Sequence, residues 1–367
     1  AGRRGFVDMT RAARSPGSTL KPLVYGLAFD QGLVHPESLI HDGPVDFDGY
    51  EPQNFDGSFR GDLRVREALQ LSLNIPVVKL TRELGPARLM AALRQSGAAP
   101  RLPGGKAGLA ISLGGIGMSL RDLVQLYAAL AAGGQGQRLR GLQDQPPEQL
   151  QRLISPAAAW HLSDILRDLP PPPGAQAGVL AYKTGTSYGH RDAWAIGWDG
   201  QHVIGVWLGR ADGTPVPGAF GGDLAAPVLF EALGRLKPSP AAFAPPPPET
   251  LILGAADLPE PLRRFRPRDA VFERRADAPQ ITFPPSGARL ELTWPTCPND
   301  SVPPPTRPSD DLTTVAGQRI LVVEDDPAVI ELLDLALSAR GAFVHAARNL
   351  EELEAMLRQD PFRAILV

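Results

Sequence analysis

Several residue types are scarce in this 367-residue sequence, and each shortage excludes a class of protein. The single cysteine, Cys297, excludes an intramolecular disulfide framework. No apolar run approaches the ~20 residues that span a bilayer. The chain opens at Ala1 without a signal peptide, which we interpret as an interior start. The net charge of −3, with no basic run interleaved with aromatics, argues against a nucleic-acid partner.

Histidine is also scarce, and its placement points to no cofactor. The six histidines form no metal-ligand pattern, so we expect no metal site built on them. His41-Asp42, and His190 with Asp192, are compatible with a histidine-based catalytic triad. No G-x-S-x-G nucleophile elbow accompanies either pair, and this disfavours the triad.

Lysine occurs at only five positions, and two of them lie in short polar strings. The first string is Ser18-Thr19-Leu20-Lys21, which follows a Pro-Gly turn. Three residues are close to one helical turn, so Ser18 and Lys21 should project from the same face of a helix start. A serine hydroxyl needs a base, and a buried lysine with a lowered pKa can serve, whereas arginine cannot. Alone, the string also fits a capped surface helix.

The second string, Ser72-Leu73-Asn74, follows an amphipathic stretch over 63–71 and precedes Ile75-Pro76. This order predicts a loop between two helices, a common position for catalytic groups. A serine two residues from an asparagine can relay a proton and hold a substrate amide. The pattern alone is equally typical of a turn or a helix cap.

The third string is Lys183-Thr184-Gly185-Thr186-Ser187. Two strand-like runs, 193–198 and 202–208, follow it around Asp199-Gly200 and predict a β-hairpin. The string should therefore lie on a preceding strand, where Gly185 lets a ligand approach the backbone. Lys183 offers a cation for a carboxylate. The alternative is a polar edge strand.

With these strings in this order, the chain resembles the transpeptidase domain of class A penicillin-binding proteins of the 1C type. The resemblance covers roughly residues 1–296 and extends to segments 50–54, 111–134, 221–227 and 281–287. It implies an α/β fold like that of penicillin-binding proteins and serine β-lactamases, in which helices flank an antiparallel sheet.

The resemblance also implies a role for each string in acyl transfer. Ser18 would attack the carbonyl between the last two D-alanines of a peptidoglycan stem peptide and form an acyl-enzyme. Lys21 would accept its proton, Ser72 would pass a proton to the departing D-alanine, and Asn74 would steady the stem amide. Backbone N–H groups of Ser18 and Thr186 would form the oxyanion hole.

The substrate-binding strand is expected to recognise the terminal carboxylate through Lys183, Thr184, Gly185, Thr186 and Ser187. Peptidoglycan stem peptides and β-lactam antibiotics are then the expected partners, at the periplasmic, extracytoplasmic face of the inner membrane. A D-alanyl-D-alanine carboxypeptidase or serine β-lactamase, with water as acceptor, remains an alternative. A non-catalytic penicillin-sensing signalling protein is another.

Two proline-rich stretches, 237–248 and 302–308, read as stiff exposed linkers. We expect an N-terminally truncated transpeptidase domain over 1–236. A linker with part of the small β domain of 1C-type proteins should cover 237–317, and a separate segment 318–367. Full-length relatives carry a membrane anchor and a glycosyltransferase domain, and we expect neither in this sequence.

The last segment predicts a β-α-β-α-β series, the start of a doubly wound parallel sheet. It resembles the first half of a response-regulator receiver domain, in which Glu324 and Asp325 would hold Mg²⁺. The phosphate-accepting aspartate would close the third strand, where this sequence stops at Val367, so we expect no phosphorelay activity. Receivers work in the cytoplasm, and this conflict in compartment suggests a fusion of two gene fragments.

Overall fold

The computed structural model describes residues 7–105, 107–141, 144–237, 239–267, 319–323, 343–347 and 364–366. The chain divides into two compact units, residues 1–275 and residues 276–367, which are described separately.

The first unit is organised on a three-stranded antiparallel sheet in the order β5-β6-β7. Its strands are β5 (Ala181–Thr186), β6 (Asp192–Trp198) and β7 (Val203–Gly209). The predicted hairpin is confirmed, and Asp199 closes its turn by accepting hydrogen bonds from the backbone N–H groups of Gln201 and His202. Every residue of β6 is buried, because the sheet is covered on both faces.

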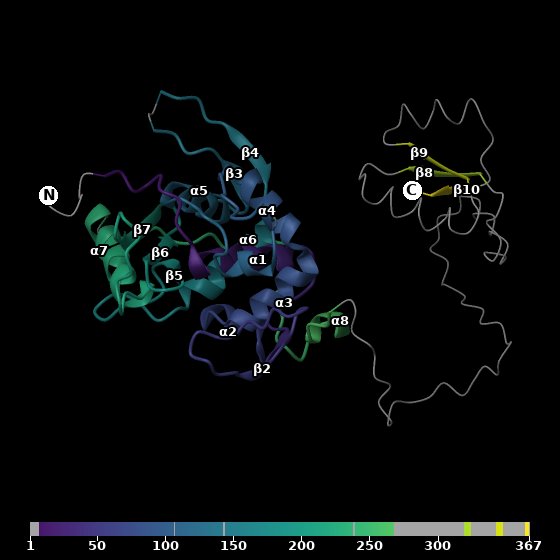
Figure 1. The fold of residues 1–367 in the computed structure, drawn as a ribbon, viewed down its shortest axis with the longest axis horizontal. Helices are drawn as coiled ribbons and strands as arrows, with labels where there is room; N and C mark the ends of the chain where they lie inside the picture. The colour runs from purple at the N-terminus through teal and green to yellow at the C-terminus, as the bar shows by residue number, and fades with distance from the viewer. Residues whose placement is uncertain are drawn as a thin grey trace. The chain divides into compact units, whose positions relative to one another are not determined.

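Helices cover both faces of this sheet (Figure 1). Helix α7 (Ala226–Leu236) packs against β6 and β7 on one face. On the other face, α5 (Leu120–Ala131) lies against β6 and β7, and α6 (Pro156–Arg167) lies against β5. Helix α1 (Lys21–Asp30) packs on α6 and is buried from Lys21 to Ala28, which makes it the centre of the apolar core.

The start of α1 is the point where the serine string meets the sheet. A short 3-10 turn, η1 (Gly17–Leu20), runs directly into α1. Pro22 occupies the first turn of the helix, where a missing N–H costs no hydrogen bond. The expectation that Ser18 lies at a helix start is therefore confirmed.

Three helices and a second 3-10 turn complete the helical layer. They are α2 (Val65–Gln70), α3 (Asn74–Leu84), α4 (Pro86–Gln95) and η2 (Leu109–Leu113). Helix α5 begins with a capping box, in which the Ser119 hydroxyl accepts from the Asp122 N–H at 3.1 Å and the Asp122 carboxylate accepts from the Ser119 N–H at 3.0 Å.

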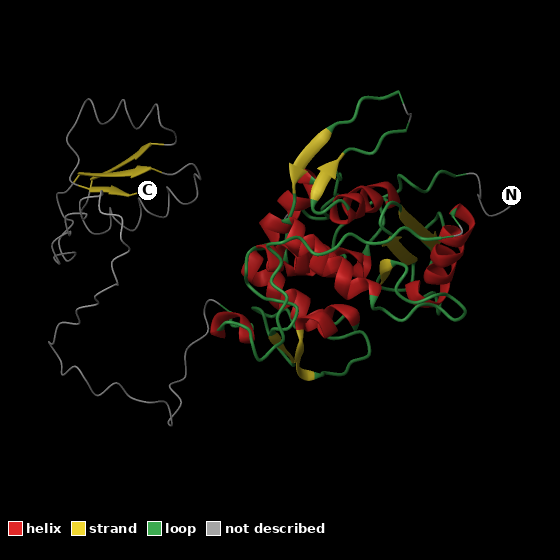
Figure 2. Cartoon of the chain, turned by 180° about the vertical axis from the view of Figure 1, so that it is seen from behind, coloured by secondary structure: helices red, strands yellow, loops and turns green. Residues whose placement is uncertain are grey.

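Two small antiparallel ribbons flank the helical layer. One pairs β1 (Leu39–Asp42) with β2 (Gly61–Arg64). The other, β3 (Gln135–Gln137) with β4 (Gln149–Arg152), is continued by a long loop that projects from the helices (Figure 2).

The proline-rich segment after α7 forms no helix or strand over 239–248. It is fixed to the sheet, since the Ala241 N–H donates to the Asp199 carboxylate at 2.8 Å. The chain then returns through α8 (Glu260–Arg263) to the first ribbon, where the Phe265 N–H donates to the Leu39 carbonyl at 2.8 Å.

The second unit contains a parallel sheet in the order β10-β8-β9. Its strands are β8 (Arg319–Val323), β9 (Phe343–Ala347) and β10 (Ala364–Leu366). The predicted acidic pair, Glu324 and Asp325, lies outside the described residues. The partial β domain is expected within residues 237–317. Residues 268–317 of that region lie outside the described residues.

Candidate active site

The serine turn sits directly on strand β5. Gly17 adopts a left-handed φ of 53°, and a Cβ added there would lie 2.5 Å from the Thr186 carbonyl oxygen. A Cβ on Gly185 would lie 2.7 Å from the Pro16 carbonyl oxygen. Real Cβ atoms do not approach oxygen so closely, so glycine at both positions is what permits the contact. Ser18, which is partly buried, is thereby held next to the third string.

Lys21 is fully buried at the start of α1, and its ammonium group is surrounded by oxygen atoms. Nζ donates to the carbonyl oxygen of Ser72, to that of Leu73 at 3.1 Å and to the Asn74 side-chain oxygen at 2.7 Å. The Ser72 hydroxyl lies 3.4 Å from Nζ. Burial, and then the charge of Lys183, hold the pKa of Lys21 well below its usual range. A neutral amine, the form that accepts a proton, is therefore accessible here.

The second string presents both its serine and its asparagine to Lys21. Ser72 adopts a left-handed φ of 55° in the connection between α2 and α3. Asn74 is the first residue of α3, so the loop predicted over 72–74 ends one residue earlier than expected. Its side-chain nitrogen donates to the Gln53 carbonyl at 2.7 Å, which turns the side-chain oxygen toward Lys21.

Lys183 lies on β5 and is only 2% exposed. Its Nζ donates to the Thr184 carbonyl oxygen at 2.8 Å. Burial lowers the pKa of Lys183 from 10.5 to about 7. Because its charge also lowers the pKa of Lys21, the two lysines lie within electrostatic reach of each other. The structure therefore brings the three strings together.

The remaining residues of the third string differ in accessibility. The Thr186 hydroxyl accepts from the Gly221 N–H at 3.1 Å, at the start of the turn η3 (Gly221–Ala225). Ser187 is buried, and its oxygen accepts from the Asp192 N–H at 2.9 Å. The Ser187 oxygen thus closes the connection between β5 and β6, whereas Thr184 and Thr186 are partly exposed.

Two aromatic side chains anchor the serine turn from other elements, and sequence reasoning missed both. Trp194 on β6 donates through its indole N–H to the Ser15 carbonyl at 2.9 Å. Tyr127 on α5 donates through its hydroxyl to the Thr19 carbonyl at 2.8 Å. Both residues fall in apolar runs that read only as core, so no local sequence signal distinguishes them.

The histidine-based alternative finds no support in the geometry. The His41 ring hydrogen-bonds Asp62 at 2.8 Å, while Asp42 points into the core. His190 packs in an aromatic cluster with Phe55 and Phe220, at ring-centroid distances of 6.2 and 4.9 Å. No group of three metal-ligating side chains occurs within the described ranges.

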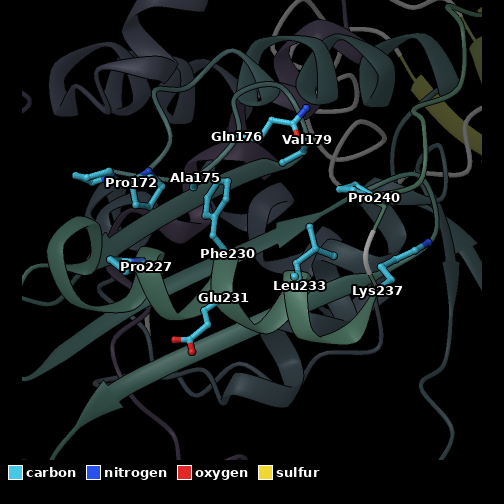
Figure 3. A pocket seen from close by; sticks show the side chains of 13 residues that line it. Pro172, Ala175, Gln176, Val179, Pro227, Phe230, Glu231, Leu233, Lys237 and Pro240 are labelled. Atoms are coloured by element: carbon cyan, nitrogen blue, oxygen red, sulfur yellow. The ribbon is translucent and has the colours of Figure 1, made fainter.

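A separate hollow of about 360 Å³ lies beside helix α7 (Figure 3). Its wall includes Phe230, whose ring meets that of Tyr182 edge-on at 5.2 Å. Successive strand residues point to opposite faces, so Tyr182 and Lys183 face opposite sides of β5. The hollow therefore lies across the sheet from the three strings.

No helix in the described ranges has the length and apolarity of a membrane span.

Comparisons with known proteins agree with this arrangement. The profile of a family described as the penicillin binding protein transpeptidase domain matches residues 7–231. Penicillin-binding protein 1C of Escherichia coli strain K12 is 48% identical over 232 residues, which are 62% of this chain and 30% of that protein. Penicillin-binding protein 1B of Vibrio cholerae serotype O1 is 29% identical over 255 residues, 58% of this chain and 30% of that protein. The chain thus spans about 30% of the length of these curated relatives.

Solved structures show the same fold. The structure of the PonA1 protein from Mycobacterium tuberculosis in complex with penicillin V matches with a TM-score of 0.56 and 24% identity, over 66% of this chain and 75% of that one. Penicillin-binding protein 1A from Haemophilus influenzae matches with a TM-score of 0.57 and 18% identity, over 67% of this chain and 46% of that one. At these identities the likeness establishes the fold alone.

Proposed function

The chain belongs to the penicillin-binding protein transpeptidase family, and we propose that its first unit is a serine-type D-Ala-D-Ala transpeptidase that cross-links peptidoglycan. The observation that carries this proposal is the convergence of a partly buried serine, a buried lysine with a lowered pKa, and a second serine 3.4 Å from that lysine. A serine hydroxyl is a weak nucleophile, and this arrangement supplies the base that it needs.

Acylation would begin when the neutral amine of Lys21 takes the proton of Ser18. The Ser18 oxygen then attacks the carbonyl carbon between the two D-alanines. The backbone N–H groups of Ser18 and Thr186 stabilise the negative charge that develops on the carbonyl oxygen. Ser72, whose hydroxyl lies beside Lys21, passes its proton to the departing D-alanine nitrogen as the peptide bond breaks and takes up the one that Lys21 holds, which leaves Lys21 neutral again.

The acyl group would then move to an amine of a neighbouring stem peptide, which forms the cross-link and frees Ser18. Asn74 would steady the stem amide, and the strand residues from Lys183 to Ser187 would recognise the terminal carboxylate. Ser187 would act mainly by shaping the end of that strand, since its oxygen already accepts from Asp192. β-Lactams, which resemble the substrate, would acylate Ser18 by the same first step.

We extend the proposal to the organisation and compartment of the chain. The transpeptidase domain, over 1–236, would work at the extracytoplasmic face of the inner membrane. Residues 237–317 would form a linker and part of a β domain, and 318–367 a receiver-like βαβαβ segment. The parallel order of β10, β8 and β9 supports a doubly wound arrangement. In such a segment Glu324 and Asp325 would hold Mg²⁺.

Covalent labelling with a fluorescent penicillin tests the proposed function. The full chain should form a stable adduct, and Ser18→Ala should form none. Ser239→Ala, which alters an exposed serine outside the strings, is the matched control and should be labelled like the original chain. Labelling of a folded Ser18→Ala variant would contradict the assignment of the nucleophile. Release of hydrolysed β-lactam with rapid turnover would instead indicate water as the acceptor.

A further inference from the structure

A buried hydrogen-bonded chain extends from Asn74 away from the reacting groups. The Asn74 N–H donates to the Asn54 side-chain oxygen at 2.8 Å. The Asn54 side-chain nitrogen donates to both oxygens of the Asp42 carboxylate, at 3.0 and 2.8 Å, and to the Ser58 carbonyl at 2.8 Å. Asn54 is 5% exposed and Asp42 is fully buried. This chain therefore starts at a carboxylate that water does not reach and ends beside Lys21.

A fully buried carboxylate is costly unless donors occupy its oxygens. The Asp42 carboxylate receives its donors from the amide of Asn54 and from the Arg60 N–H at 2.8 Å. Asp42 is the last residue of β1. Burial, and then the charge of Asp42, raise the pKa of the Tyr25 phenol. The donors arrive from two separate segments of the chain, so the carboxylate fixes their positions relative to β1.

The acceptor-only character of a carboxylate sets the direction of the first link in this chain. The Asn54 amide must turn its nitrogen toward Asp42, so its oxygen faces the Asn74 N–H. That bond holds the first turn of α3. The Asn74 side chain gives its own nitrogen to Gln53, so its oxygen faces Lys21 at 2.7 Å. One buried charge thus orients the Asn54 amide, and Asn54 with its neighbour Gln53 holds Asn74 in place.

We propose that Asp42 and Asn54 are positioning residues for the base Lys21. Through Asn54 they hold the adjoining Gln53 carbonyl and the Asn74 backbone in place. The Asn74 oxygen, and with it the geometry of the amine that receives the Ser18 proton, depends on both. The inference rests on the proposed function of Ser18 and Lys21, because it concerns the same site. Asp42 touches neither reacting atom, and its effect passes through Asn54 and Asn74.

The substitution Asp42→Asn tests this inference. The nitrogen of the amide introduced at position 42 is a donor and would face the Asn54 nitrogen, which is also a donor. The hydrogen bond between residues 42 and 54 therefore breaks, or the Asn54 side-chain amide flips. The acylation rate constant at saturating penicillin should fall by about tenfold to a hundredfold, the range expected for a small misplacement of catalytic groups. The apparent dissociation constant of the non-covalent complex should change much less, because the Lys183 strand is untouched.

The exchanged pair Asp42→Asn with Asn54→Asp provides a rescue. Its amide and carboxylate again face each other as donor and acceptor, and the carboxylate at position 54 can still accept from the Asn74 N–H. This double variant should recover a clear part of the lost acylation rate. If the fold-losses in acylation rate of the two single variants simply multiply in the double variant, the two residues act independently. That result would contradict the proposed chain.

Two controls separate positioning from general stability. Asp62→Asn changes a partly exposed carboxylate on the paired strand β2 and should acylate normally. Leu89→Ala opens a cavity in α4, where the side chain is 1% exposed, and should lower thermal stability without slowing acylation. If Asp42→Asn behaves like Leu89→Ala, Asp42 only supports the fold and the inference is overturned.

Lysine NMR provides a readout that does not depend on activity. With carbon-13 at the ε position the protein gives few resonances, because the chain has only five lysines, Lys21, Lys79, Lys106, Lys183 and Lys237. The resonance that disappears in Lys21→Arg belongs to Lys21. It should shift in Asp42→Asn and stay in place in Asp62→Asn.

An unchanged Lys21 resonance in folded Asp42→Asn overturns the inference, even if acylation slows. Absence of labelling in the original chain would instead contradict the proposed function. In that case the Lys21 resonance alone still decides whether Asp42 positions this side chain.

Discussion

The two buried lysines of the site belong to different regions, one helical and one on the sheet, and their surroundings differ. Lys21 donates to three oxygens supplied by the second string and lies 3.4 Å from a serine hydroxyl. Lys183 donates to the carbonyl oxygen of the next residue on its own strand. Burial is the largest cause of the lowered pKa of both side chains. The comparison shows that burial lowers both pKa values, whereas the oxygen partners decide whether the amine is fixed in one position.

This difference suggests a division of labour within the site. A fixed amine beside a serine hydroxyl suits repeated proton transfer, which depends on short and constant distances. An amine with fewer partners can turn toward an incoming carboxylate. Because the pKa of Lys183 is about 7, its ability to bind a carboxylate should weaken as the pH rises above neutral.

The largest expected effect comes from replacing each lysine by arginine. Lys21→Arg should reduce penicillin acylation by about a thousandfold, since a guanidinium cannot take the proton and general-base catalysis contributes on this scale. Lys183→Arg should cost about tenfold, because a guanidinium still pairs with a carboxylate. Stopped-flow labelling with matched thermal unfolding measures both. Equal losses in the two variants would remove the proposed distinction between them.

A second test acts on the contact between the two regions. Gly185→Ala would place a methyl group 2.7 Å from the Pro16 carbonyl oxygen and so push β5 away from the serine turn. Acylation should fall by about a hundredfold. Thermal unfolding should show a loss of about 1–3 kcal/mol.

Gly234→Ala is the matched control for this change, since a Cβ there meets open space in helix α7. It should label normally and gain up to about 1 kcal/mol of stability from the better helix former. Normal labelling of Gly185→Ala would show that acylation does not require the close approach of β5 to the serine turn.

The smallest expected effect concerns the electrostatic link between the lysines. The charge of Lys183 lowers the pKa of Lys21, so Lys183→Met should raise it. The neutral amine of Lys21 then appears only at higher pH, and the acidic limb of the residual acylation rate should move to higher pH. The pH profile of labelling measures this shift. A limb that moves to lower pH would show that the two charges do not interact as described.

The sequence predicted those features of the site that local spacing determines. The separation of Ser18 and Lys21, the hairpin at Asp199-Gly200 and the strand that carries Lys183 all follow from patterns within a few residues. The contacts that bring the strings together do not. Trp194 reaches back to Ser15 across 179 positions, and short-range periodicity carries no trace of such a bond.

Asp42 and Ser187 show two further limits of local reasoning. Asp42 was noted only for its neighbour His41, yet strand alternation sends the two side chains to opposite faces. The third string predicts a ligand-binding role for Ser187, and the structure adds a hydrogen bond from the Asp192 N–H to its oxygen. In each case folding adds a contact that the local sequence does not show.

The left-handed backbone of Ser72 has a consequence for protein engineering. A residue with a side chain resists this conformation by about 1 kcal/mol or more, and glycine adopts it freely. A thermostability screen ranked by backbone preference would therefore select glycine at position 72 early. That choice would delete the hydroxyl beside Lys21. Under the proposed mechanism, the most heat-resistant clones of such a library would be enriched in variants that lack the proton relay.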